Sequence, residues 1–128
     1  MVSKQEQENK LALIPKAEKY IEYMLDIIMK LPRTEKFSIG TEYKQSMYKM
    51  LEKIMWLNNT KNNNESKEII YTLNYIDSKL NTQRIYLRIM KKYKWIDEKK
   101  FKVSMELIYE IGKILGGLIK YYAKNNKK

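Results

Sequence analysis

The sequence predicts an all-α protein, an antiparallel up-down-up-down four-helix bundle. Apolar residues recur at three- and four-residue steps through four long segments, and this spacing lines one face of a helix. The chain has only two prolines and four glycines, so little turn chemistry remains for a β-rich fold. We expect one bundle over residues 13–123, between a flexible N-terminus (1–12) and a basic C-terminal tail (124–128).

The first two predicted helices are joined by a loop that begins with proline. The first helix should start near Pro15, a favoured first-turn residue, and end before Pro32. The loop should bury Phe37 and Ile39, and Ser38 is a candidate N-cap for the second helix. The expected core positions are Ala17, Tyr20, Ile21, Met24, Leu25, Ile28 and Leu31, then Tyr43, Met47, Met50, Leu51, Ile54 and Leu57.

The third and fourth predicted helices cover residues 65–93 and 101–123. An asparagine-rich turn over residues 58–64 precedes the third helix. Asp97 should cap the fourth helix, because its carboxylate can accept a hydrogen bond from the first turn. The expected core positions are Ile69, Leu73, Ile76, Leu80, Leu87 and Met90, then Phe101, Met105, Ile108, Ile111, Leu115, Leu118 and Tyr122.

Two glycines of the fourth helix, Gly112 and Gly116, lie four residues apart on one face. A glycine costs a helix interior about 1 kcal/mol relative to alanine, so the pair indicates a close-packing surface, within the bundle or between copies of a homo-oligomer. The longest apolar run there is six residues, against about 20 for a membrane span. The polar N-terminus has no signal-peptide pattern, so we expect a cytoplasmic protein.

The charge pattern favours a binding protein over an enzyme. The chain has neither cysteine nor histidine, so we expect no metal site of Cys/His type, no cofactor and no Cys or His nucleophile. Of the net charge of +11, +9 falls in residues 84–128. This asymmetry favours a polyanionic partner, although a lysine-rich solvated surface is the other interpretation. Glu106 and Glu110 are more typical of solvated or lysine-paired carboxylates than of a general acid/base pair.

Arg84, Arg88 and Lys91 are spaced to share one face of the third helix, beside its core stripe. Two of the chain's three arginines lie in this row. Because a guanidinium binds phosphates and carboxylates bidentately, the row is a candidate site for RNA or protein. The alternative is an ordinary solvated helix face that pairs with Glu106 or Glu110.

Three segments in order resemble a family of bacterial four-helix-bundle proteins. They are Leu31-Pro32-Arg33 with Phe37-Ser38-Ile39-Gly40, Arg84-x-x-x-Arg88, and Ile111-Gly112-Lys113-Ile114-Leu115-Gly116-Gly117-Leu118-Ile119-Lys120. The family includes proteins encoded in ribosomal RNA intervening sequences and the accessory variability determinants of diversity-generating retroelements. The second and third segments are similar to the retroelement branch, and Gly117 of this chain is an added glycine relative to that branch.

The resemblance implies a non-catalytic accessory protein of a diversity-generating retroelement. Such a protein assembles as a homopentameric ring and binds the element's reverse transcriptase and template RNA, which supports mutagenic cDNA synthesis. Arg84 and Arg88 match the basic residues of that branch, and Lys91, Lys92 and Lys113 extend the candidate site by charge. RNA should then bind mainly through its phosphates. An intervening-sequence protein with another RNA-related or scaffold role, and a plain structural oligomer, are the alternatives.

Overall fold

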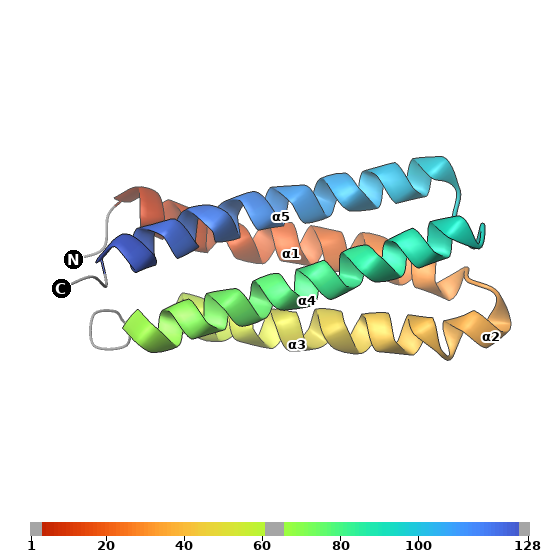
Figure 1. The fold of residues 1–128 in the computed structure, drawn as a ribbon, viewed down its shortest axis with the longest axis horizontal. Helices are drawn as coiled ribbons and strands as arrows, with labels where there is room; N and C mark the ends of the chain where they lie inside the picture. The colour runs from red at the N-terminus through yellow and green to blue at the C-terminus, as the bar shows by residue number, and fades with distance from the viewer. Residues whose placement is uncertain (1–3, 61–65, 126–128) are drawn as a thin grey trace.

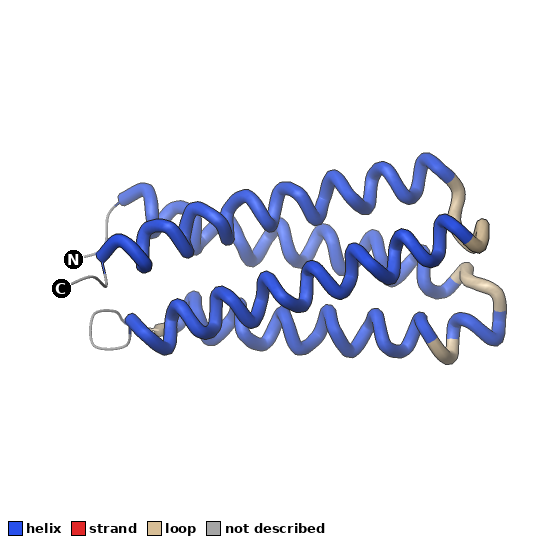
Figure 2. The backbone as a smooth tube through the Cα atoms, viewed as in Figure 1, coloured by secondary structure: helices blue, strands red, loops and turns tan. Residues whose placement is uncertain are grey.

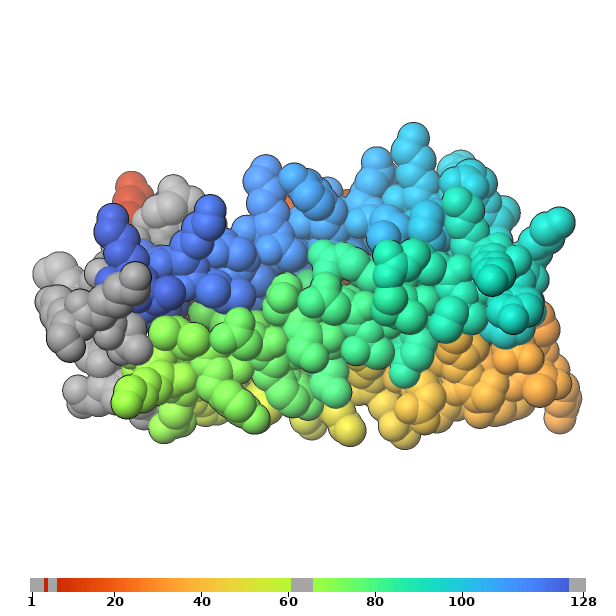
Figure 3. All heavy atoms as spheres, viewed as in Figure 1, coloured from red at the N-terminus to blue at the C-terminus, as the bar shows by residue number. Residues whose placement is uncertain are grey.

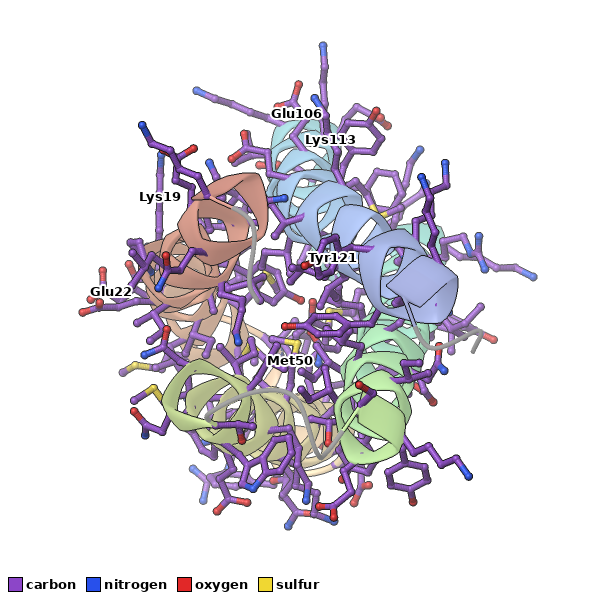
Figure 4. The ribbon with its side chains drawn as sticks, turned by 90° about the vertical axis from the view of Figure 1, so that its left-hand side faces the viewer. Lys19, Glu22, Met50, Glu106, Lys113 and Tyr121 are labelled. Carbon is purple, nitrogen blue, oxygen red and sulfur yellow. The ribbon has the colours of Figure 1, made fainter. Side chains whose placement is uncertain are left out.

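The computed structural model of the chain describes residues 4–60 and 66–125. These residues form α1 (Lys4–Met29), α2 (Arg33–Lys36), α3 (Ile39–Asn59), α4 (Ser66–Lys92) and α5 (Glu98–Asn125). The four long helices run alternately up and down, which confirms the predicted bundle, and α2 adds one turn between α1 and α3 (Figure 1, Figure 2). Seen end-on, they surround one core in the order α1, α3, α4, α5 (Figure 4), and each contacts its two neighbours in this order.

The core runs along the bundle axis and is built from the predicted stripes. All six positions expected in α4 are fully buried, and Met50 of α3 points into the middle of the bundle (Figure 4). Four of the other expected positions are only partly buried: Leu25, Leu51, Phe101 and Met105. Four further apolar residues are buried beside the stripes: Leu13, Ile27, Ile96 and Leu107. Among the described residues, no helix has both the length and the apolar character needed to cross a bilayer.

The predicted start of the first helix near Pro15 is wrong, because α1 begins at Lys4 and contains Pro15. A proline inside a helix costs about 3 kcal/mol, through its missing N–H and a clash with the preceding turn. Packing compensates for this cost: Leu13 is buried, and Lys10 Nζ donates a hydrogen bond to Tyr122 Oη of α5 (3.5 Å). At the other end, α5 reaches Asn125, and the rest of the predicted tail lies outside the described residues. Residues 61–64 of the predicted asparagine-rich turn also lie outside them, and its first two residues belong to α3.

The connection between α1 and α3 differs from the predicted loop. Phe37 is 68% exposed, so the expectation that it would be buried is wrong, whereas Ile39 packs partly against the core. Gly40 makes the junction compact, because a Cβ built on it would lie only 3.0 Å from Ile28 Cγ2. Ser38 does occupy the N-cap position of α3, but its hydroxyl bonds back to α2 and not to the first turn of α3.

A chain of hydrogen bonds crosses the apolar core and joins α1, α3 and α4. Tyr20 Oη donates to Gln83 Oε1 (2.6 Å), so the proton between the two tyrosine hydroxyls (2.5 Å) comes from Tyr43. On the other side, Gln83 Nε2 donates to Ser46 Oγ (3.0 Å), and Ser46 donates to the carbonyl of Lys79 (3.5 Å). Each hydroxyl and amide along this path therefore has a partner. Such a fully satisfied buried network favours one alignment of the helices over others.

Candidate interface on α4 and α5

The predicted row of Arg84, Arg88 and Lys91, which we call the α4 basic row, lies where α4 borders α5. Arg84 crosses to Gly112 of α5 at one end of the row. At the other end, the ammonium of Lys91 forms an ion pair with Glu98 (3.1 Å) and lies 4.5 Å from the ring centroid of Phe101. Since Arg88 stands between these two residues on the same helix face, it also borders the junction with α5.

Arg84 is half-buried and lies against α5 at Gly112. Its Nη2 lies 2.9 Å from the point that a Cβ on Gly112 would occupy, and its Nη1 donates a hydrogen bond to Asn81 Oδ1. Burial raises the pKa of Tyr20 well above its ordinary value, and the nearby Arg84 charge opposes that shift. Gly112 thus has the packing reason that the sequence indicates, but the group packed on it is an arginine side chain of the same chain.

Arg88, Lys91 and Lys92 are exposed cations of α4 near this junction, and Arg88 and Lys92 differ from Lys91 in their contacts. Within the described part of the chain, neither Arg88 nor Lys92 forms a hydrogen bond or an ion pair. The Arg88 guanidinium is therefore available to bind a carboxylate or phosphate from a partner. Lys91 offers less, because Glu98 already neutralises part of its charge.

Lys113 lies on the other flank of α5 and is not part of the α4 basic row. It lines a depression between α1 and α5, on the outer side of the bundle (Figure 4), together with Asn9, Lys16, Glu110 and Ile114. There Lys16 Nζ donates to Glu110 Oε1 (3.0 Å), and this bond lowers the pKa of Glu110. Glu110 is thus lysine-paired, as the sequence suggests, and its partner lies on α1 and not in the arginine row.

Gly116 differs from Gly112, because it is exposed. A Cβ built on Gly116 would meet no heavy atom within 4 Å in the described structure, whereas one on Gly117 would lie 3.8 Å from Asn9 Nδ2. Gly116 therefore has no packing role within one copy of the chain. A contact between copies stays a prediction for this position.

Sequence reasoning missed a second basic surface, at the end of the bundle where α4 turns into α5. The sequence signal is Lys91-Lys92-Tyr93-Lys94-Trp95, in which lysines alternate with aromatic residues. The rings of Tyr93 and Trp95 stack at a centroid distance of 5.3 Å and an interplanar angle of 22°. Tyr93 is 62% exposed, whereas Trp95 packs partly against the core.

The backbone of this turn ends α4 in a Schellman motif. The N–H of Trp95 donates to the carbonyl of Met90 (2.9 Å), and the N–H of Lys94 donates to that of Lys91 (3.0 Å). Lys94 has a φ of 63°, in the left-handed region, where a non-glycine residue costs about 1 kcal/mol. Asp97 then caps α5, as predicted, by accepting a hydrogen bond from the N–H of Lys100 (2.8 Å).

Comparison with known proteins places the chain in a family. Residues 11–122 match a family model described as bAvd-like, which is consistent with the accessory variability determinants. No curated protein and no solved structure shows significant similarity to the chain. The matched range contains the α4 basic row, Lys92, Lys113 and all four glycines. Because the match covers most of its length, the chain belongs to the bAvd-like family.

Proposed function

We propose that this protein is the non-catalytic accessory protein of a diversity-generating retroelement. In this role it binds the element's reverse transcriptase and template RNA and supports mutagenic cDNA synthesis. The observation that carries the proposal is the family match over residues 11–122, which extends into all four long helices. The net charge of +11 supports a polyanionic partner such as RNA.

Within this function, Arg88 makes the main contact of the α4 basic row with a partner. Its guanidinium is exposed, and no described residue of the chain engages it. Arg84 acts as a positioning residue, because its side chain is bonded to Asn81 of α4 and packs on Gly112 of α5. Lys92 adds charge on α4, and Lys113 extends the positive field over the opposite flank of α5.

Replacing Arg88 with alanine is expected to weaken capture of the reverse transcriptase or the template RNA at least tenfold. Truncating an exposed side chain should change the free energy of unfolding by no more than about 0.5 kcal/mol. Arg84→Ala should instead lower it by about 1 kcal/mol, because Asn81 loses its partner and the surface of Gly112 is uncovered. The measurement is a pull-down with immobilised protein against each partner alone and both together, alongside urea unfolding.

Lys49→Ala is the matched control, since it removes one exposed positive charge from α3. Arg88→Lys separates the two kinds of contact: lysine restores a diffuse attraction to phosphate but not a bidentate bond to a carboxylate. Full capture of both partners by a folded Arg84→Ala, Arg88→Ala double variant would refute this assignment.

We also propose that the protein assembles as a ring of five copies, with Gly116 in the contact between them. Gly116→Leu should leave each copy folded, because its side chain enters open space, and should even favour the helix by up to about 1 kcal/mol. The same side chain should overpack a contact between copies and reduce the assembled mass in light scattering. Gly116→Ala should have a smaller effect. A monomeric mass for the unmodified protein at tens of micromolar would contradict the ring.

A further inference from the structure

We propose that one end of the bundle is a site for single-stranded RNA, in which bases stack on Tyr93 and Phe37 while lysines contact the phosphates. This surface, the basic end, comprises residues 30–38 and 92–102. It lies where α1 passes into α3 and where α4 turns into α5, on the right in Figure 1 and Figure 3. The inference rests on the RNA-binding part of the proposed function and gives that RNA a site beyond the α4 basic row.

The basic end is rich in uncompensated positive charge. It holds eight Lys/Arg residues and three carboxylates, and its net charge of +5 is nearly half that of the whole chain. The carboxylates already have partners: Glu35 accepts from Ser38 Oγ (3.2 Å), Asp97 caps α5, and Glu98 pairs with Lys91. Six of the eight cations are exposed: Lys30, Arg33, Lys92, Lys94, Lys99 and Lys102. A polyanion therefore meets cations from both connections of this end.

Two exposed aromatic rings stand among these cations. Phe37 is 68% exposed and lies next to Lys36, and Tyr93 is 62% exposed between Lys92 and Lys94. Tyr93 is also held in place, because one face of its ring stacks on Trp95, which in turn packs against the core. A ring fixed in this way, with most of its surface in solvent, can stack on a base with little further loss of side-chain freedom.

Lys94 indicates that charge at this turn serves binding and not folding. Its position in the Schellman motif has a φ of 63°, at which glycine would fit without strain. The chain nevertheless has a lysine there, between the two stacked aromatic residues. Backbone strain of this kind is typical of functional sites, where a residue is retained for the role of its side chain although its backbone conformation is unfavourable.

The combination of flat rings and cations fits an unpaired strand better than a duplex. In a duplex the bases are stacked on one another, so an exposed tyrosine finds no free base face and only phosphate contacts remain. In a single strand each base offers a face for stacking, and the neighbouring phosphates can reach the surrounding lysines. Single-stranded RNA is therefore the partner that uses both features of the basic end.

The test is a titration of the full-length protein with a fluorescently labelled single-stranded RNA and with a duplex of the same length. Tyr93→Ala should weaken single-strand binding roughly 5- to 150-fold, the loss expected for one stacked base. Tyr93→Phe should retain binding. Tyr71→Ala is the matched control, because Tyr71 is an exposed tyrosine on α4, outside the basic end. In a Trp56→Phe background, emission from Trp95 should change as the single strand binds.

Lys94→Gly gives a second readout that a purely structural role would not produce. It should raise the urea midpoint of unfolding, because it relieves the left-handed strain, and yet weaken RNA binding, because it removes a cation. Single-strand binding that is unaffected by Tyr93→Ala, Phe37→Ala and Lys94→Gly would overturn the proposal. Equal affinity for the duplex would do the same, as would binding to anionic lipid vesicles in place of RNA.

Failure of this site can be told apart from failure of the proposed function. If the unmodified protein binds no RNA at low salt, both the RNA-binding part of the proposed function and the basic-end site are wrong. Binding of the reverse transcriptase is tested separately, by its capture in the absence of RNA. If RNA binding depends on Arg88 and is insensitive to Tyr93, the function stands and only the basic-end site is wrong.

Discussion

Replacing Gln83 with alanine is expected to lower the free energy of unfolding by about 2–4 kcal/mol. The substitution removes the acceptor of the Tyr20 hydroxyl and the donor to Ser46, both in the core, and leaves a cavity. An unsatisfied buried polar group costs about 1–3 kcal/mol, and the cavity adds to that cost. Urea unfolding followed by circular dichroism would measure the change.

The loss should depend on the polar partners that remain. Replacing the whole path with apolar groups, as Tyr20→Phe, Tyr43→Phe, Ser46→Ala and Gln83→Leu together, should recover much of the stability, since no buried group is then left unpaired. If the separate effects of Gln83→Ala and Tyr20→Phe simply add, the two residues are not coupled and the network is not a unit.

Alkaline pH is expected to destabilise the protein steeply once it exceeds about 10. Burial raises the pKa of both Tyr20 and Tyr43 above their ordinary value of about 10. Above pH 10 the unfolded chain has therefore released these two protons while the folded protein still holds them, so stability falls as pH rises. Two such groups give a slope of up to about 2.7 kcal/mol per pH unit, which continues until the folded-state pKa values are reached.

Urea unfolding at half-unit steps from pH 8.5 to 11 would measure this slope. Lysines also titrate in this range, so the control is the Tyr20→Phe, Tyr43→Phe double variant, which keeps every lysine. It should be less stable than the unmodified protein at pH 8.5 but lose less stability with rising pH. Parallel pH profiles for the two proteins would show that the buried tyrosines are not the cause.

The bundle could be predicted because the sequence patterns that specify its helices are periodic and local. Stripes such as Ile69 to Met90 specify a buried face, and Asp97 specifies a cap, without reference to the rest of the chain. The start of α1 could not be predicted in this way, because packing of Leu13 and Lys10 outweighs the local signal of Pro15. Phe37 was misjudged because an apolar residue in a loop is buried only if the neighbouring elements cover it.

The candidate sites depend on contacts that span long sequence separations. The sequence places Arg84 and Arg88 on one face, but only the fold shows that Arg84 rests on Gly112 while Arg88 is exposed. Gln83 did carry a signal, since it is a polar residue in register with Leu80 and Leu87 in the core stripe. The sequence does not single out Tyr93, because an aromatic residue between lysines is as typical of a solvated helix end as of a binding site.

The missing side chain at Gly112 also controls how many arginines the surface of α4 displays. Arg84 can lie against α5 only because residue 112 ends at its backbone. Any larger residue at this position would push the guanidinium outward and place a second mobile arginine one turn from Arg88. The residue at position 112 of α5 thus determines how many arginines of α4 are exposed to a partner. A substitution at Gly112 alone could therefore raise the affinity for an anionic partner, without any change in α4 itself.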